Sequence, residues 1–312
     1  MSDSQGILKI GIVGLENAGK TTMIQTLRQN FKIALPIGSM PPTKSVERTS
    51  VSIFGQETTI WDYGGQEVYR NNYLKNPERY LSELRYLFFV VDMQDPEKFD
   101  KSLSYFEEIY GHLLELHSKA IISIFFHKID PRIKATPDMI QRIQTIRDRF
   151  QNVLSGIEVG FYETSCLDPL TVLSACSLPI LGAFPIYNEI SVLFAEFAME
   201  HEIEYINLIV DDLFEVGAFR LIKAGQNFLP ASQEFYQEMA ELKFDKKLKE
   251  SVHDKYTFFS QGHKVSSKDT KYNYRVNLAF PSNLEKPPKK KDLHGLNKKI
   301  NKLFEKYHPQ LY

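Results

Sequence analysis

Residues 14–21 read GLENAGKT, which matches the phosphate-binding pattern G-x-x-x-x-G-K-[S/T] at every fixed position. Immediately before it, Ile7–Val13 alternates and then becomes continuously apolar, as expected of a buried strand. Immediately after it, Thr22–Arg28 carries apolar residues at helical spacing. A chance glycine-rich turn is the alternative, and the strand and helix on either side argue against it. The sequence therefore predicts a phosphate-binding loop between a strand and a helix.

The residue types of this loop suit the binding of a phosphate chain. Gly14 and Gly19 allow the backbone to fold closely around an anion. The N–H groups of residues 17–21 are expected to point inward, at the positive end of the following helix. Lys20 is expected to contact the β- and γ-phosphates, and the Thr21 hydroxyl to bind Mg²⁺. The expected binding residues of the loop are Gly14, Glu16, Asn17, Ala18, Gly19, Lys20, Thr21 and Thr22.

Length and composition set broader limits. The 312 residues favour two domains, and 38 basic residues balance 39 acidic ones, so we expect no nucleic-acid partner. Cys166 and Cys176 have no C-x-x-C spacing, which argues against a zinc site or a disulfide framework. No signal peptide, myristoylation glycine or long apolar run is found. We therefore expect a soluble, cytoplasmic protein whose membrane association, if any, comes through partners.

The first 180 residues alternate strand and helix patterns. Strands are predicted at 49–54, 58–62, 86–92, 120–127 and 159–165, and helices at 67–83, 97–118, 136–153 and 169–181. The first two of these strands flank Gly55 and are typical of a hairpin. The apolar runs at 86–91 and 120–126 indicate strands covered on both faces. Together with the first strand, they predict a six-stranded, mostly parallel sheet with helices on both faces and one antiparallel edge.

The pattern changes after Pro179, Gly182 and Pro185. Helices are predicted at 186–203, 231–252 and 293–307, and strands at 205–210, 216–223, 255–260 and 272–280, with polar loops at 261–271 and 281–292. Strands grouped in pairs favour an antiparallel sheet flanked by helices. We therefore predict one domain over residues 1–183 and a second over residues 184–312.

Further residues bear on hydrolysis. Residues 62–66 read DYGGQ at the end of a predicted strand, which places Asp62 near a bound Mg²⁺. Gly65 would let a backbone N–H approach the γ-phosphate, and Gln66 would orient the attacking water. Thr43, in the long loop before the second strand, can complete the Mg²⁺ ligands when GTP is bound. The expected metal ligands are thus Thr21, Thr43 and Asp62, and the expected catalytic residues are Gln66, Lys20 and Thr43.

The residues 127–130, HKID, and 163–167, ETSCL, indicate which base is bound. Asp130 can accept hydrogen bonds from guanine N1–H and the exocyclic amine, which adenine cannot donate in that geometry. The stem of Lys128 can cover the base, and His127 is expected to tie this loop to the phosphate loop. Ser165 would steady Asp130. The expected base-binding residues are His127, Lys128, Asp130, Ser165, Cys166 (through its N–H) and Leu167.

The order and spacing of GLENAGKT, PPT, WDYGGQE, HKID and ETSC resemble the small GTPases of the Ras superfamily. Within it the chain resembles the Rag/Gtr group, which has His-Lys-x-Asp, a WDYGGQE-like stretch running into Asn72-Tyr73, and a C-terminal roadblock domain. The resemblance implies GTP as substrate, GDP as product and Mg²⁺ as cofactor. It also implies that the pattern from residue 186 is a roadblock or longin-like fold. Such proteins pair through this domain, usually as heterodimers, and work with activating and exchange proteins.

One part of the loop departs from that group. Residues 15–18, LENA, resemble the Arf-type loop, and Glu16 stands where Ras-type loops have glycine. Glu16 could crowd Gln66 and make hydrolysis slow, or it could simply point outward. We therefore predict a Rag-like GTP/GDP switch with slow hydrolysis and a C-terminal assembly domain. Two alternatives stay open: a nucleotide-binding scaffold with little turnover, and an Arf-like trafficking GTPase with an unrelated C-terminal appendage. The lysine-rich last helix could likewise be a docking face or a solvated one.

Overall fold

The computed structural model describes residues 8–28, 42–53, 56–181, 184–210, 214–221, 228–241, 249–266 and 271–307. The predicted features of the N-terminus, Pro41 of the PPT stretch and residues 242–248 of the predicted helix lie outside these ranges. The chain divides into two compact units, and the change to the second unit falls within one helix, between Ala175 and Cys176. The domain boundary at residues 183/184 stays a prediction.

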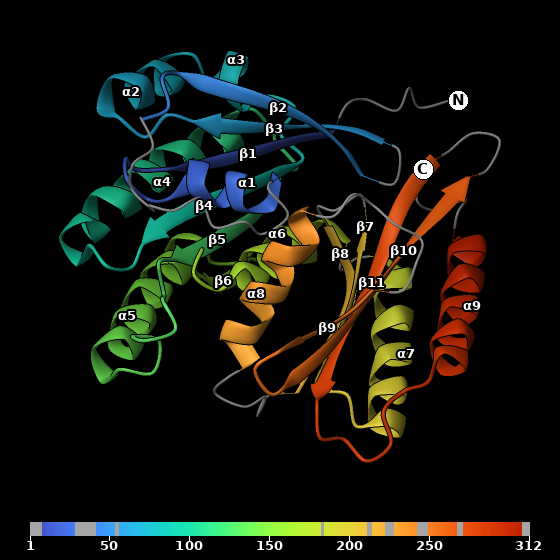
Figure 1. Cartoon of the computed structure of the whole chain (residues 1–312). Coiled ribbons are helices and arrows are strands. Elements are labelled where there is room, and N and C mark those ends of the chain that lie inside the picture. Colours follow the sequence, from blue (N-terminus) through green and yellow to red (C-terminus); the bar gives the residue numbers. More distant parts are fainter. Residues whose placement is uncertain are drawn as a thin grey trace. The chain divides into compact units, whose positions relative to one another are not determined.

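The first unit contains a six-stranded sheet in the order β2-β3-β1-β4-β5-β6 (Figure 1). The strands are β1 (Leu8–Gly14), β2 (Val46–Ile53), β3 (Gln56–Tyr63), β4 (Tyr86–Asp92), β5 (Ile121–His127) and β6 (Gly160–Thr164). β1 pairs in parallel with β3 and β4, β4 with β5, and β5 with β6. Only two residues join β2 to β3, too few for a parallel crossover, so this edge is a hairpin. The predicted fold class of the first domain is confirmed.

The helices of this unit follow the predicted pattern with one interruption. They are α1 (Lys20–Arg28), α2 (Glu67–Lys75), α3 (Pro77–Leu81), α4 (Phe99–Glu115), α5 (Pro137–Val153) and α6 (Pro169–Leu181), with a short 3₁₀ helix η1 (Pro96–Lys98) before α4. The predicted single helix over 67–83 is wrong at Asn76, whose backbone leaves the helical region (φ −132°, ψ 55°). Pro77 follows it, and a proline disfavours a helical residue before it and lacks the N–H that would continue the helix.

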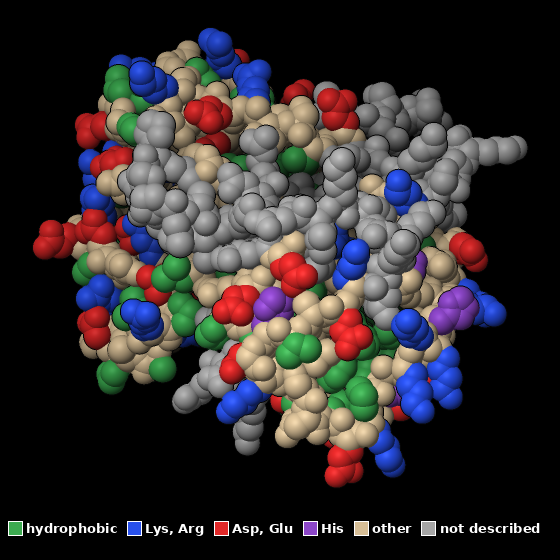
Figure 2. Space-filling model, in the orientation of Figure 1, with side chains coloured by type: hydrophobic (Ala, Val, Ile, Leu, Met, Phe, Trp, Pro, Cys, Tyr) green, Lys and Arg blue, Asp and Glu red, His purple; other side chains and the backbone are tan. Residues whose placement is uncertain are grey.

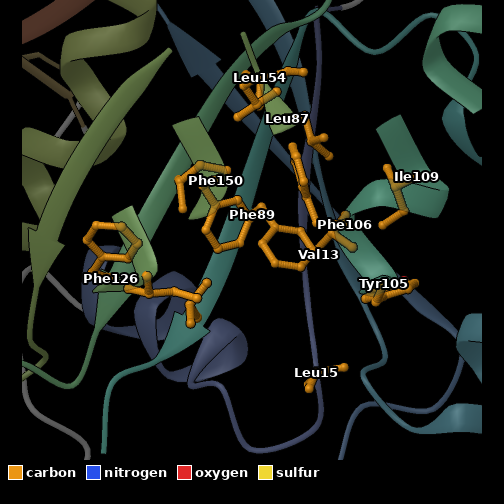
Figure 3. Close-up of a cluster of buried hydrophobic side chains, with 14 of the residues drawn as sticks. Val13, Leu15, Leu87, Phe89, Tyr105, Phe106, Ile109, Phe126, Phe150 and Leu154 are labelled. Carbon is orange, nitrogen blue, oxygen red and sulfur yellow. The ribbon is translucent and has the colours of Figure 1, made fainter. Parts of the chain in front are cut away.

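Aromatic side chains fill the core on one face of this sheet. Phe89 of β4, Phe106 of α4 and Phe150 of α5 are fully buried and meet in one cluster (Figure 3). The ring centroid of Phe106 lies 5.1 Å from that of Phe89 and 5.1 Å from that of Phe150. On the other face, Phe88 of β4 stacks on Phe125 of β5 at 4.9 Å. Burial on both faces accounts for the unbroken apolar runs of these strands.

The second unit contains a five-stranded antiparallel sheet in the order β8-β7-β11-β10-β9. Its elements are α7 (Pro185–His201), β7 (Tyr205–Val210), β8 (Phe214–Arg220), α8 (Phe228–Glu241), β9 (Lys249–His253), β10 (Tyr256–Ser266), β11 (Lys271–Pro281) and α9 (Lys290–Tyr307). Phe258 of β10 stacks on Phe235 of α8, whereas Tyr274 of β11 packs on Phe304 of α9. The register places these two sheet residues on opposite faces, so the helices cover both sides. The predicted antiparallel second sheet is confirmed.

Two predictions for this unit are wrong. The predicted helix over 231–252 ends at Glu241, and Lys249–His253 is instead the edge strand β9, paired with β10. The predicted loop over 261–271 is mostly strand, because β10 continues to Ser266 and β11 begins at Lys271. In β9 the backbone ladder with β10 forms although most side chains are polar, and alternate residues of this strand are exposed.

The polar face of the last helix is exposed in the structure. Basic side chains gather over α9 (Figure 2), where Lys290, Lys291, Lys298, Lys299, Lys302 and Lys306 are all exposed. The opposite side of α9 buries Leu293, Leu296, Ile300 and Phe304. Among the described residues, none of the helices combines the length and the apolar composition that crossing a membrane requires.

Candidate functional site

The candidate residues follow the ends of parallel strands that meet at one edge of the first sheet. β1 ends at Gly14, and α1 begins at Lys20. Between them the loop needs left-handed backbone at Asn17 (φ 64°) and Gly19 (φ 91°). A Cβ on Gly14 would lie 2.3 Å from the carbonyl oxygen of Val90 in β4, so only glycine can stand there. This curvature leads the chain into the N-terminus of α1, where free N–H groups favour anions.

Lys20 is held over the loop by its own backbone. Its ammonium donates to the carbonyl oxygens of Gly14 (3.0 Å) and Leu15 (2.8 Å), and its side chain is buried. Burial lowers the pKa of Lys20 to about 8, while the charges of Asp62 and Glu16 oppose this change. A buried ammonium bonded only to neutral carbonyls is well placed to gain from an anionic partner.

The three predicted metal ligands come together. Thr21 Oγ1 donates to Asp62 Oδ2 at 2.6 Å and lies 2.8 Å from Thr43 Oγ1, which is 3.3 Å from the same carboxylate oxygen. Asp62 Oδ1 is buried, and no hydrogen-bond partner for it is found among the described residues. Burial raises the pKa of Asp62 above its usual value. Two hydroxyls and one under-satisfied carboxylate are oxygen donors of the kind that suit Mg²⁺.

Gly65 lies directly against the phosphate loop. A Cβ on Gly65 would stand 2.3 Å from the backbone nitrogen of Glu16 and 2.3 Å from the carbonyl carbon of Leu15. Gln66 caps α2 through its carbonyl, which accepts from the N–H groups of Tyr69 and Arg70. The Gln66 side chain makes no capping hydrogen bond and is partly exposed. Its side chain therefore does not cap the helix and is partly open to water, one residue after the contact of Gly65 with the loop.

Arg70 is a residue of this site that sequence reasoning missed. It is 6% exposed, its Nε donates to the carbonyl oxygen of Gly65 at 3.0 Å, and its guanidinium lies over the ring of Tyr105. Its buried Nη2 has no hydrogen-bond partner in the part of the chain described here. Its charge contributes to the lowered pKa of Lys20. The only sequence signal would have been a cation one helical turn after Gln66.

Glu16 is partly buried within the loop. Its Oε2 atom is buried and makes no hydrogen bond to the described residues. Its charge acts on the buried Lys20, whose pKa it raises against the effect of burial. The carboxylate is therefore partly shielded from bulk water, and its charge reaches the buried Lys20.

The base-binding candidates also converge. Ser165 Oγ donates to Asp130 Oδ1 at 2.6 Å, and the N–H of Leu167 donates to Ser165 Oγ at 3.0 Å. Asp130 and Ser165 follow the neighbouring parallel strands β5 and β6. Lys128, between the end of β5 and Asp130, adopts a left-handed backbone (φ 65°). The strand ends thus present one carboxylate that is already oriented by a hydroxyl.

His127, the first residue of the HKID segment, contacts both the segment after β6 and the phosphate loop. Its Nδ1 lies 2.9 Å from Thr164 Oγ1 and its Nε2 lies 3.5 Å from Cys166 Sγ. A Cβ on Gly19 would stand 2.5 Å from the Cδ2 atom of His127. Burial lowers the pKa of His127 to about 3, so the ring is neutral. Burial also raises the pKa of Cys166 to about 11, so its thiol stays protonated.

The turn after β4 also reaches the base-binding segment, which sequence reasoning missed. The ammonium of Lys128 donates to Asp92 Oδ2 at 2.5 Å, and Nε2 of Gln94 donates to Asp130 Oδ2 at 2.8 Å. Asp92 stands opposite His127 in the β4–β5 register. Pairing β4 with β5 in this register would have placed the turn after Asp92 beside the residues that follow His127.

The chain is similar to proteins of known family. The family model of the Gtr1/RagA G protein conserved region matches residues 9–241. An ADP-ribosylation factor of Encephalitozoon cuniculi is 27% identical over 169 residues, covering 54% of this chain and 72% of the relative. ADP-ribosylation factor-like protein 3 of Caenorhabditis elegans is 30% identical over 149 residues, covering 46% and 73%.

Among solved structures, the Arl6 (BBS3) small GTPase from Trypanosoma brucei, with the bound nucleotide analogue GppNp, is 18% identical and gives a TM-score of 0.43. The match covers 56% of this chain and 95% of that one. The family match extends over most of the chain and includes every predicted site residue. The chain therefore belongs to the Gtr1/RagA family of G proteins, and it is a GTP-binding GTPase of the Ras superfamily.

Proposed function

We propose that this GTPase binds GTP with Mg²⁺ in the first unit, hydrolyses it slowly to GDP and phosphate, and signals through partners bound to the second unit. The observation that carries the proposal is the meeting of Thr21, Thr43 and Asp62 beside the buried Lys20. These oxygens come from three segments far apart in the sequence. Among the described residues one oxygen of the Asp62 carboxylate is buried without a hydrogen-bond partner, which suits the binding of a metal ion.

Phosphate binding would fall to the loop and Lys20. The N–H groups around Asn17 to Thr21 would bind the phosphate oxygens, and the ammonium of Lys20 would exchange its carbonyl partners for the β- and γ-phosphates. When bound by Thr21, Thr43 and Asp62, Mg²⁺ would neutralise charge on the phosphate oxygens. The guanine base would be read by Asp130, supported by Ser165.

Hydrolysis would require little more than positioning. Gln66 would orient a water whose oxygen forms the new bond to the γ-phosphorus while the bond to the bridging oxygen breaks, leaving GDP and phosphate. Lys20 and the loop N–H groups would stabilise the charge that develops on the phosphate oxygens. Asp62 is engaged with the two threonine hydroxyls, so it is not available as a general base beside Gln66. Slow hydrolysis follows.

A switch needs segments that sense the γ-phosphate. Thr43 and Gly65 belong to two segments on either side of the β2–β3 hairpin, and both reach the site: Thr43 through its hydroxyl and Gly65 through its backbone. They are joined to each other by the hydrogen bond from Gly64 N–H to the Ser45 carbonyl. Release of phosphate would therefore loosen both segments together.

The second unit would serve assembly with another Rag-like or roadblock-domain protein, as a heterodimer or a homodimer. Its sheet has two edge strands, β8 and β9, and unpaired strand edges are frequent sites of association. Activating and exchange proteins would then set the nucleotide state. Both cysteines are buried and neither forms a disulfide among the described residues, which supports a reducing cytoplasmic setting. Size measurement of the chain alone and mixed with roadblock proteins tests the pairing, and a strict monomer in every mixture would contradict it.

The metal claim is tested by Asp62→Asn. In the unchanged protein, removal of Mg²⁺ with EDTA should speed release of a fluorescent GTP analogue by at least about tenfold, the usual scale of a lost metal ligand. In Asp62→Asn this difference should nearly vanish. The control is Asp148→Asn, an exposed carboxylate on α5. Equal EDTA sensitivity in both variants would contradict the assignment.

A second candidate is an Arf-like trafficking GTPase with an unrelated appendage. It is favoured by the two ADP-ribosylation factor relatives, whose matches cover 54% and 46% of this chain. A chain that never pairs through its second unit would favour this reading.

A further inference from the structure

The end of β4 and the turn after it, residues 92–94, contact the base-binding segment, residues 127–130, at four points. The Met93 N–H donates to the carbonyl of His127 at 2.9 Å. Asp92 pairs with the ammonium of Lys128. The Nε2 amide of Gln94 donates to the carbonyl of Lys128 at 2.9 Å and to Asp130 Oδ2 at 2.8 Å. These contacts join residues that are 34 to 36 positions apart in sequence.

Gln94 and Ser165 donate hydrogen bonds to different oxygens of the Asp130 carboxylate. Ser165 donates to Oδ1, and Gln94 donates to Oδ2. Each carboxylate oxygen has two acceptor sites, so both oxygens can still accept from a base. A carboxylate held at both oxygens cannot turn about its bond to the side chain without losing one of these hydrogen bonds. Ser165 alone would hold one oxygen and leave that rotation less restricted.

We propose that Gln94 is a positioning residue that sets base specificity, by fixing the plane of the Asp130 carboxylate toward the N1–H and exocyclic amine of guanine. The inference rests on the proposed function of Asp130. Gln94 itself would not touch the base. Its second bond, to the Lys128 carbonyl, holds the segment in its left-handed turn at the same time.

Loss of Gln94 should affect the binding of guanine and hypoxanthine nucleotides differently, whereas loss of a merely structural brace would affect both equally. Hypoxanthine keeps the N1–H of guanine but lacks the exocyclic amine. It can therefore use only one of the two directions in which an aligned carboxylate accepts. Misalignment of Asp130 should thus weaken binding of GDP more than binding of IDP. General loosening of the segment should weaken both by the same factor.

The experiment measures release of fluorescent GDP and IDP from the full chain in the presence of Mg²⁺. Gln94→Ala should speed GDP release about tenfold, which is the usual effect of one hydrogen bond to a charged group, and IDP release by no more than about threefold. Gln94→Glu should speed GDP release further, because it places a second carboxylate against Asp130.

The matched control is Gln144→Ala. Gln144 is also exposed, and its amide also donates to an aspartate, Asp148, at 2.7 Å, but it lies on α5 away from the base-binding segment. It should leave both release rates unchanged. Thermal melting of the variants should match that of the unchanged protein, since the Gln94 side chain is exposed.

Two results would overturn the inference alone: GDP release from Gln94→Ala within about twofold of the Gln144→Ala rate, or equal acceleration of GDP and IDP release. A different result would overturn the proposed function together with the inference. That result is an unchanged protein from which ADP displaces fluorescent GDP as well as GDP does.

Discussion

The imidazole of His127 lies directly against the backbone of Gly19, so closely that a Cβ at Gly19 would stand 2.5 Å from the ring. His127 ends β5, and Gly19 precedes α1. The contact therefore joins the base-binding segment to the phosphate loop. The ring also bonds to Thr164 at the end of β6, which fixes its orientation. A nucleotide that spans both segments would thus meet a site whose two halves are already held together.

Acidification should weaken the fold through His127. Burial lowers its pKa from 6.5 to about 3, so between these values the unfolded chain binds a proton that the folded chain does not. The free energy of unfolding should therefore fall as pH falls below about 6.5, by roughly 1.4 kcal/mol per pH unit from this group. Urea unfolding at several pH values should show this slope in the unchanged protein and a shallower one in His127→Asn.

The aromatic cluster of the first unit should dominate its stability. Phe106→Ala removes the ring that contacts both Phe89 and Phe150, and we expect a loss of about 3–5 kcal/mol in the free energy of unfolding. Leu114→Ala, on the same helix but exposed, should change it by less than about 0.5 kcal/mol. Denaturant unfolding of both variants decides the matter. Equal losses would show that the cluster is not the main source of stability.

Glu16 should slow hydrolysis. Its carboxylate is partly buried in the loop whose backbone contacts Gly65, and Gln66 directly follows Gly65 in the sequence. We expect Glu16→Gly to raise the single-turnover rate without a partner at least about threefold, which corresponds to roughly 0.6 kcal/mol in the barrier. Glu16→Gln keeps the size of the side chain and removes its charge. A faster rate in this variant would indicate an effect of the charge, whereas an unchanged rate would indicate steric crowding of Gln66. An unchanged rate in Glu16→Gly would mean that the side chain has no part in hydrolysis.

Most of the first unit could be predicted from its sequence because its central strands β1, β4 and β5 are buried on both faces. The run YLFFVVD gives the bounds of β4 correctly, since nothing polar interrupts it before Asp92. The strand β9 could not be predicted, because KESVH has one apolar residue, Val252, which is itself exposed. Backbone hydrogen bonds to β10 hold β9 in place, and such bonds do not require a particular pattern of side chains in the sequence.

The candidate site divides in the same way. Residues such as Lys20, Asp62 and Asp130 stand in fixed patterns and could be named in advance. Arg70 and Gln94 could not, because they act on the site through hydrogen bonds to Gly65 and Asp130 that depend on how α2 and the turn after β4 pack. Motif spacing in the sequence identifies the residues expected to contact the ligand. The residues that position them can be found only in the folded structure.

The central claim is that this chain hydrolyses GTP with a water positioned by Gln66. Its most direct test is single-turnover hydrolysis of GTP by the full chain and by Gln66→Leu, with GTP affinity measured in parallel. We predict slow but measurable hydrolysis by the unchanged protein, a rate at least about tenfold lower in Gln66→Leu, and similar affinity in both. Equal rates at equal affinity would contradict the account and favour a nucleotide-binding scaffold instead.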